Sequence, residues 1–300
     1  MRVLIALLLG VAISAASGTA RADGAADYPS LRESHDARLQ RELERVVSDL
    51  GLVGAVRSAR LCLVLADITD RRDPRVAELN GDHMMYAASL PKIAILFAAL
   101  KDIERGRLTL DDALYRRMSK MVRVSSNADA TFVLNRVGTD RINRLLEDEP
   151  FRLYDPLVGG GLWVGKAYAQ GRAYERDPLH HISHGATAMQ AARFYWLLDT
   201  GQLTTPALTE IGRRILANPG IRHKFVRGLS ARPVVRMYRK SGSWRQWHAD
   251  SALVESGSKR FILVGLAQDP DGGHWLERLA EPLHDTVVPP AHNRQLAAHR

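Results

Sequence analysis

The sequence predicts an α/β (α+β) fold in which N- and C-terminal helices flank an antiparallel sheet that carries an inserted all-helical lobe. Strand-like segments stand in two groups, before residue 87 and after residue 233, and short turns join the neighbours within each group. A helical block at about 107–218 separates the two groups. Strands that follow one another with short turns pair antiparallel, and helices at the two ends of the chain can then cover one face of the sheet.

The first half of the chain supplies a helix, two strands and a second helix. Segment 31–51 has helical periodicity and ends at a glycine. Strands follow at 60–69 and at about 76–86, with an Asp-Pro turn between them. The next helix is predicted to begin at Ser89. Its segment 93–100 has no polar face, so this helix should be buried on all sides.

The second half supplies the inserted block and the rest of the sheet. Helical patterns in the block cover 108–118, 127–138, 139–148, 187–201 and 205–218. Strand patterns follow at 234–243, 248–257 and 259–269, and a closing helix covers about 274–286. A ligand site is expected in the groove between the helical lobe and the sheet.

The chain reads as one exported unit. Its 300 residues are 46% hydrophobic and 25% charged, with no internal repeat, which predicts a single catalytic domain at 23–286 and a loose tail at 287–300. Residues 1–22 combine a positive start, an apolar stretch and a small-residue end, which is typical of a secretory signal peptide. The apolar stretch is short for a membrane anchor, and no later segment is long enough to span a bilayer. We therefore expect a secreted or periplasmic monomer without stable membrane insertion.

Charge, cysteine and histidine content narrow the function classes. The formal net charge is +9, and it falls to +7 without the two arginines of residues 1–22. Export and the lack of an arginine-rich motif argue against nucleic acid. The single cysteine, Cys62, has apolar strand neighbours and should be a buried, inert thiol. His180, His181 and His184 lack a carboxylate or cysteine at ligand spacing, so a loop role is favoured over zinc. We expect no metal and no cofactor.

One lysine, Lys92, interrupts the apolar helix. A buried charge is costly unless it is paired, and burial lowers the pKa of a lysine. Ser89 lies three residues earlier, on the same helical face. A lysine with a lowered pKa can take the proton of a serine and make it a nucleophile. A second Ser-x-x-Lys match, Ser256 to Lys259, lies in a turn between two strands and is interpreted as a chance match.

Two further polar groups follow in order. Ser125-Ser126-Asn127 precedes a helix, and Lys240-Ser241-Gly242, followed by Ser243, lies in a strand. Each group has a structural alternative. Ser125 and Ser126 could only cap the helix, and Lys240 could be a solvated lysine that protects an edge strand.

In this order the three groups resemble the S-x-x-K, S-D-N and K-T-G signature of penicillin-binding proteins and serine β-lactamases. The resemblance is to class A β-lactamase-like serine hydrolases and spans about residues 31–286, with Ser126 in place of Asp and Ser241 in place of Thr. It implies the β-lactamase/transpeptidase-like fold and an acyl-enzyme on Ser89, with Lys92 as the base. It also implies that Ser125 relays a proton to the leaving nitrogen and that Asn127 orients the bound amide and Lys92.

The resemblance assigns the strand residues to substrate binding. Lys240 would attract a substrate carboxylate and Ser241 would hydrogen-bond it. The backbone N–H groups of Ser89 and Ser243 would form the oxyanion hole. Gly242 would let the substrate backbone approach the strand closely.

One expected element is missing. Class A β-lactamases carry a loop whose Glu-x-x-Leu-Asn pattern supplies the glutamate that activates the deacylating water. Residues 175–177, Glu-Arg-Asp, resemble the end of that loop, but 158–174 contain neither a glutamate nor Leu-Asn. Other candidates for the missing base are Asp155, Glu175, Lys166, Tyr168 and Tyr174. The sequence therefore predicts acylation but does not predict rapid hydrolysis.

The predicted function is that of an exported serine hydrolase that forms an acyl-enzyme with a β-lactam or a related amide or ester near a carboxylate. One alternative is a D,D-peptidase or penicillin-binding protein that acts on peptidoglycan peptides. Another is a non-catalytic binding protein that keeps the fold. Trp244 follows the Lys-Ser-Gly strand and is expected to line the cleft, whereas Trp163 and Trp247 fit packing equally well.

Overall fold

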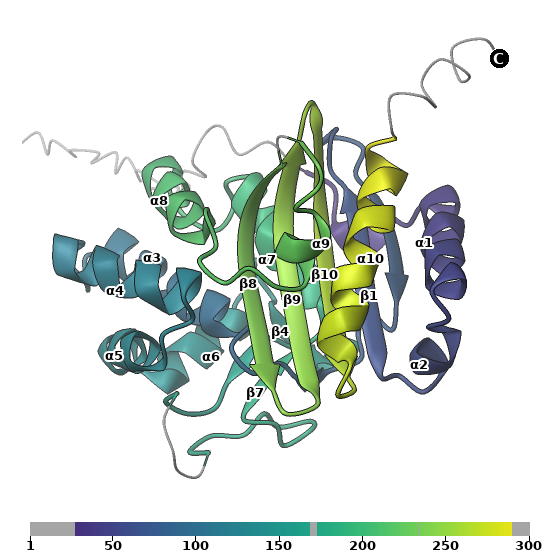
Figure 1. Ribbon diagram of the computed structural model, residues 1–300. Helices are drawn as coiled ribbons and strands as arrows, with labels where there is room; N and C mark the ends of the chain where they lie inside the picture. Colours follow the sequence, from purple (N-terminus) through teal and green to yellow (C-terminus); the bar gives the residue numbers. More distant parts are fainter. Residues whose placement is uncertain (1–27, 169–172, 234, 290–300) are drawn as a thin grey trace, which may run out of the picture.

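The computed structural model describes residues 28–168, 173–233 and 235–289 (Figure 1). The signal peptide predicted at 1–22 and nearly all of the tail predicted at 287–300 lie outside the described residues. Within the described residues, no helix has both the length and the apolar character that crossing a membrane requires.

A five-stranded antiparallel sheet forms the centre, as predicted. Its strands are β1 (Leu61–Asp67), β2 (Arg75–Leu79), β8 (Val235–Trp244), β9 (Trp247–Ser256) and β10 (Lys259–Gln268), in the order β2-β1-β10-β9-β8. β1 is buried along its whole length, which explains its unbroken apolar sequence. β8 lies at an edge of this sheet, so the side of β8 that faces away from β9 pairs with no other strand of the sheet.

Two cores lie on opposite faces of the sheet, because side chains along a strand alternate between faces. Leu61, Leu63 and Leu65 of β1 join the core under α1 (Ala37–Asp49) and α10 (Gly272–Val287). The alternate residues of β1, such as Val64, join the larger core with α7 (Ala188–Asp199) and the helical block. Figure 1 shows α10 in front of the sheet and α7 behind it. The prediction that the terminal helices cover one face is confirmed.

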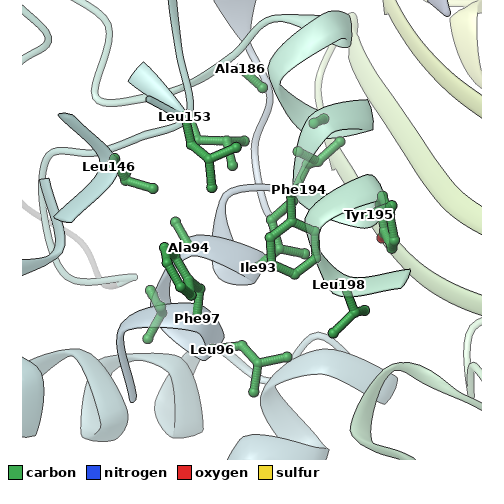
Figure 2. Close-up of a cluster of buried hydrophobic side chains, with 14 of the residues drawn as sticks. Ile93, Ala94, Leu96, Phe97, Leu146, Leu153, Ala186, Phe194, Tyr195 and Leu198 are labelled. Atoms are coloured by element: carbon green, nitrogen blue, oxygen red, sulfur yellow. The ribbon is translucent and has the colours of Figure 1, made fainter. Parts of the chain in front are cut away.

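The helical block stands beside the sheet (Figure 1). It contains α3 (Lys92–Glu104), α4 (Asp112–Arg123), α5 (Asn127–Val137), α6 (Thr139–Glu147) and α8 (Pro206–Leu216). Helix α3 is buried on every side from Lys92 to Leu100, as its apolar sequence predicts. Figure 2 shows Ile93 and Phe97 of α3 packed between Leu146 of α6 and Phe194 of α7. Side chains of α3 therefore pack both on the other helices of the block and on α7.

Several boundaries differ from the prediction, such as that of α4, which was expected at 108–118 and covers Asp112–Arg123. The helix expected at 31–51 is a short 3₁₀ turn, η1 (Leu31–Glu33), followed by α1, which begins where the Asp36 carboxylate accepts a hydrogen bond from the N–H of Leu39. The strand expected at 76–86 is two strands, because Asn80 has a left-handed φ of +53° that ends β2. The helix expected to begin at Ser89 begins at Lys92, and Ser89 lies in the preceding turn.

The span 107–218 also contains short strands besides its helices. β3 (Met85–Tyr86), β7 (His184–Ala186) and β6 (Trp163–Val164) form a small sheet, and β4 (Tyr154–Asp155) pairs with β5 (Gly160–Gly161) around η2 (Pro156–Val158). Helix α7 packs on the central sheet rather than within the helical block. The remaining short helices are α2 (Val53–Arg57) and α9 (Phe225–Gly228). The small sheet ties the loop before α7 to the turn that carries Ser89.

Candidate active site

Ser89 lies in a tight turn between β3 and α3. Ala88 has a left-handed φ of +50°, and Leu90 N–H donates to the Ala87 carbonyl at 3.0 Å. The Ala87 N–H donates to the carbonyl of His184 in β7 at 2.9 Å, which fixes the turn to the small sheet. Ser89 is half-buried, and its hydroxyl makes no hydrogen bond to another described residue. The turn therefore presents a free serine hydroxyl three residues before Lys92.

Lys92 is fully buried at the start of α3. Its Nζ donates to the Ser125 carbonyl at 2.6 Å and to Asn127 Oδ1 at 2.7 Å, and it lies 3.3 Å from Ser125 Oγ. Burial lowers the pKa of Lys92 from 10.5 to about 7. No carboxylate among the described residues pairs with Lys92, so near neutral pH its amine is free to accept a proton.

Ser125 bridges the two lysines of the site. Its backbone is left-handed, with φ of +57°, a region that residues other than glycine rarely occupy. Its Oγ accepts a hydrogen bond from Lys240 Nζ at 2.9 Å and faces Lys92 Nζ on the other side. The next residue, Ser126, is the N-cap of α5, and its Oγ accepts from the Asp129 N–H at 3.2 Å. The capping alternative thus applies to Ser126, whereas the Ser125 hydroxyl points to the lysines.

Lys240 is a buried lysine, and the solvated edge-strand alternative is wrong. Its side chain is 1% exposed, and its Nζ also donates to the Ser241 carbonyl at 2.5 Å. Burial and then the charge of Lys92 hold the pKa of Lys240 well below its ordinary value. Two buried lysines therefore share one serine hydroxyl.

Strand β8 crosses directly over the Ser89 turn at Gly242. A Cβ on Gly242 would lie 2.2 Å from the Ala87 carbonyl oxygen and 2.8 Å from the backbone nitrogen of Ser89, so only glycine fits. Ser241 is buried and Ser243 is exposed on either side of this crossing. The residues predicted for the site, Ser89, Lys92, Ser125, Asn127, Lys240, Ser241, Gly242 and Ser243, therefore lie in three segments that meet at one place.

Sequence reasoning missed Lys224, which supports β8 from behind. Its Nζ donates to the Gly242 carbonyl at 2.5 Å, to Ser243 Oγ at 2.9 Å and to the Ala249 carbonyl at 3.0 Å. Lys224 is 3% exposed, and burial lowers its pKa to about 8. In the sequence it belongs to an Arg-His-Lys run that is typical of an exposed loop, so no signal identified it.

The nearby carboxylates point elsewhere. Asn143 of α6 donates to Glu175 Oε2 at 3.4 Å, and burial together with Asp140 raises the pKa of Glu175. Asp155 Oδ1 accepts from the Leu157 N–H at 2.9 Å. Within the described part of the chain, no carboxylate contacts Lys92 or the Ser125 hydroxyl.

Of the other candidates for the missing base, Tyr168 reaches the site. Its ring centroid lies 4.5 Å from Lys92 Nζ. Tyr174 is 72% exposed, and its hydroxyl donates to Asp140. Burial, and then the charge of Lys166, lowers the pKa of His184.

The second Ser-x-x-Lys match lies in the β9–β10 turn, as interpreted, but it has an unexpected setting. Ser256 Oγ is 2.9 Å from His284 Nε2, and His284 Nδ1 is 2.9 Å from Asp285 Oδ1. This order of groups is that of a Ser-His-Asp triad. However, Ser256 and His284 are both 4% exposed, so a substrate carbonyl has no approach to the serine. The network instead fastens α10 to the sheet.

The remaining polar candidates serve packing or surface roles. His180 Nε2 lies 3.1 Å from the Gly159 carbonyl, whereas His184 is buried beside Tyr168, so the two rings occupy different surroundings. No group of three metal-ligating side chains occurs among the described residues. Trp163 is buried, and Trp247 packs edge-on against Tyr86. Trp244, 57% exposed, ends β8 beside the site.

Comparisons with known proteins agree with the fold. The family model described as the beta-lactamase enzyme family matches residues 42–127 and 116–287. A solved structure of PBP-A is 15% identical with a TM-score of 0.65 and covers 88% of this chain and 100% of its own. A β-lactamase from Sphaerobacter thermophilus is 14% identical with a TM-score of 0.65 and covers 84% of this chain and 99% of its own.

A third solved structure shows an acyl-enzyme. It is a point mutant of PBP-A in an acyl-enzyme complex with penicillin G, 16% identical, with a TM-score of 0.66 over 85% of this chain and 98% of its own. At these identities the likeness concerns the fold. No curated protein matches the chain.

Proposed function

This chain belongs to the beta-lactamase enzyme family, and from that premise we propose that it is a serine hydrolase that forms an acyl-enzyme on Ser89. The observation that carries the proposal is the setting of Lys92. This buried amine has a pKa lowered to about 7 and has no carboxylate partner among the described residues. Lys92 stands three residues after Ser89 in the sequence. An amine in this state is suited to take the serine proton at neutral pH.

Acylation begins at the Ser89 hydroxyl. The Ser89 oxygen attacks the carbonyl carbon of the amide or lactam, and Lys92 takes the hydroxyl proton. Ser125, which lies between Lys92 and Lys240, passes its proton to the leaving nitrogen as the carbon–nitrogen bond breaks, and it takes up the proton that Lys92 removed from Ser89. The product is an ester between the substrate acyl group and Ser89, with the amine released or, in a lactam, kept attached.

Charge that develops on the carbonyl oxygen needs two donors. We assign them to the backbone N–H groups of Ser89 and Ser243, because Gly242 brings β8 against the Ser89 turn. Lys224 supports this edge by holding the Gly242 carbonyl and the Ser243 hydroxyl. Lys240 and Ser241 supply the positive and hydrogen-bonding groups for a substrate carboxylate, and Asn127 holds both Lys92 and the bound amide.

The proposal extends to location and substrate. The segment 1–22 would export the protein, which would then act as a monomer on a β-lactam or a peptidoglycan-like peptide outside the cytoplasm. No cofactor enters the mechanism, because lysine and serine side chains supply every proton transfer.

A D,D-peptidase is the second candidate, and one observation favours it. No carboxylate among the described residues contacts Lys92 or Ser125, so the group expected to activate a deacylating water is missing. Such an enzyme would keep a penicillin as a long-lived ester while turning over peptides that end in D-alanine. Release of D-alanine from such a peptide would identify it.

Intact-protein mass spectrometry after mixing with penicillin G tests the proposal. We expect a mass increase equal to one penicillin that disappears in Ser89→Ala and persists in Ser256→Ala, which removes the serine of the second Ser-x-x-Lys match. Decay of the adduct within seconds would indicate a β-lactamase, and persistence for hours would indicate a peptidase or a penicillin-binding protein. Absence of any adduct, together with no release of D-alanine, would overturn the proposal in favour of a non-catalytic binding protein.

A further inference from the structure

Three groups are stacked in a row at the back of the site. The amine of Lys92 lies 4.5 Å from the centre of the Tyr168 ring. The Tyr168 ring stacks on the imidazole of His184, with centroids 4.2 Å apart and an interplanar angle of 8°. The Tyr168 hydroxyl donates to the carbonyl of Ala88, next to Ser89, at 3.4 Å. The flat side of Tyr168 therefore covers Lys92, and its end reaches the nucleophile turn.

His184 holds the Tyr168 ring in place at an energetic cost. His184 is 2% exposed, and neither ring nitrogen has a hydrogen-bond partner among the described residues. Buried polar atoms without partners destabilise a fold, so such groups require an explanation. Burial, followed by the charges of Lys166 and Lys92, lowers the pKa of His184 to about 3, which keeps the ring neutral. A neutral ring fixed by β7 is a flat, dry support for Tyr168.

We propose that Tyr168 is a positioning residue that keeps water away from Lys92 and from the acylated Ser89, and that it makes the acyl-enzyme long-lived. This inference rests on the proposed function. Hydrolysis of the ester requires a water oxygen to attack the acyl carbon while the bond from carbon to the serine oxygen breaks. The water proton must return to that serine oxygen. An aromatic wall that excludes water slows this step.

The groups that face Lys92 make the effect of Tyr168 predictable. Ser125 and Asn127 come from the start of α5, Lys240 from β8, and Tyr168 with His184 from the segment that runs from β6 to β7. None of these five side chains carries a carboxyl group. The ring attracts a charged Lys92, but the pKa of Lys92 is nevertheless lowered from 10.5 to about 7, so desolvation is the larger effect. Removing the ring should admit water and raise this pKa.

The test compares Tyr168→Ala with Tyr168→Phe, which keeps the flat ring and loses only the hydroxyl. Tyr174→Ala is the matched control, because Tyr174 is an exposed tyrosine of the same loop. The lifetime of the penicillin adduct is followed by intact mass. We expect about a tenfold or greater acceleration of adduct decay in Tyr168→Ala, and a lifetime within about twofold of the parent in the other two variants.

A second measurement does not depend on activity. The ¹³Cε chemical shift of Lys92, followed by NMR against pH in protein that contains ¹³C-lysine, reports the pKa of this buried amine. Tyr168→Ala should raise that pKa by about one unit or more, and Tyr168→Phe should leave it near 7. If Tyr168→Ala fails to fold, Tyr168→Leu replaces it.

The two proposals fail in different ways. No adduct in the parent protein would overturn the proposed function, while the titration curve of Lys92 would still report whether Tyr168 shields this amine. An adduct lifetime and a Lys92 titration curve that are the same in the parent and in Tyr168→Ala would overturn the role of Tyr168 alone.

Discussion

At the scale of single residues, two adjacent serines have separate tasks. Ser125 adopts a left-handed backbone that places its hydroxyl between Lys92 and Lys240. Ser126 has an ordinary negative φ of −55° and caps α5. The strained conformation of Ser125 is consistent with a role in function, because such strain persists mainly where the surrounding structure enforces it.

This division predicts opposite results for two alanine variants. Ser125→Ala should slow penicillin acylation by about 100-fold, the lower end of the usual contribution of one proton-transfer group. Ser126→Ala should acylate like the parent but lose about 1 kcal/mol of unfolding free energy, because it loses a cap. Acylation rates by mass spectrometry and urea unfolding curves measure the two effects. A Ser126→Ala variant that acylates slowly at full stability would contradict the division.

The residues predicted from sequence are those with local motifs. Ser89, Ser125 and Lys240 stand in short patterns whose chemistry can be recognised without a structure. Lys224 and His184 contribute through contacts with residues 18 or more positions away or on another strand, and no local pattern records such contacts. Tyr168 was one of several candidates until the structure placed its ring on Lys92.

At the scale of elements, the approach of β8 to the Ser89 turn decides whether the site exists. The two segments are joined at Gly242, where any Cβ would meet backbone atoms that cannot move aside as a side chain could. Behind this point, Asp250 of β9 holds Arg239 of β8 through two hydrogen bonds of 2.6 and 2.7 Å, both ends buried. β8 is thus fixed to β9, and the close contact at Gly242 sets its distance from the Ser89 turn.

Gly242→Ala should therefore move β8 away from Ser89 while the fold remains. We expect acylation to fall by about 100-fold or more, the usual size of a lost oxyanion donor. Gly54→Ala in α2 is the matched control, because a Cβ there meets no atom within 4 Å. Circular dichroism and adduct formation measure both variants. Full acylation by Gly242→Ala would show that this approach is not needed.

Elements with a strong period were predicted, and those without one were not. The antiparallel sheet, the buried α3 and the terminal helices follow from patterns of apolar residues along many positions. The two-residue strand β6 carries too few positions to show a period. β3 was expected as the end of one strand at 76–86, but it is separate from β2 and pairs with β7, which is far away in sequence. Because α7 is apolar on nearly all sides, its sequence did not reveal that it packs on the sheet.

At the scale of the whole molecule, one buried carboxylate joins distant parts. Asp199, at the end of α7, accepts hydrogen bonds from Arg71 at 2.7 Å and Arg213 at 3.0 Å, and it lies 3.3 Å from Arg260. These arginines come from the β1–β2 loop, α8 and β10. Pairing of this kind offsets the cost of burying the Asp199 charge. Buried histidines that lack such partners make the unfolding free energy sensitive to acid.

Stability should fall below pH 6.5 because of His184. The pKa of His184 is lowered to about 3 in the folded protein and returns to about 6.5 on unfolding, so between these values the unfolded chain binds a proton that the folded chain does not. The unfolding free energy then decreases as the pH falls, by up to about 1.4 kcal/mol per pH unit for this one group. His223, whose pKa is lowered to about 4 chiefly by burial, acts in the same direction.

His184→Phe keeps a ring against Tyr168 and cannot be protonated, so its unfolding free energy should fall less steeply between pH 6.5 and 5.0. His180→Phe, a change at an exposed histidine, should follow the parent curve. Urea unfolding at several pH values measures these slopes. Equal slopes for the parent and His184→Phe would mean that His184 is not held neutral, and the dry support for Tyr168 would lose its basis.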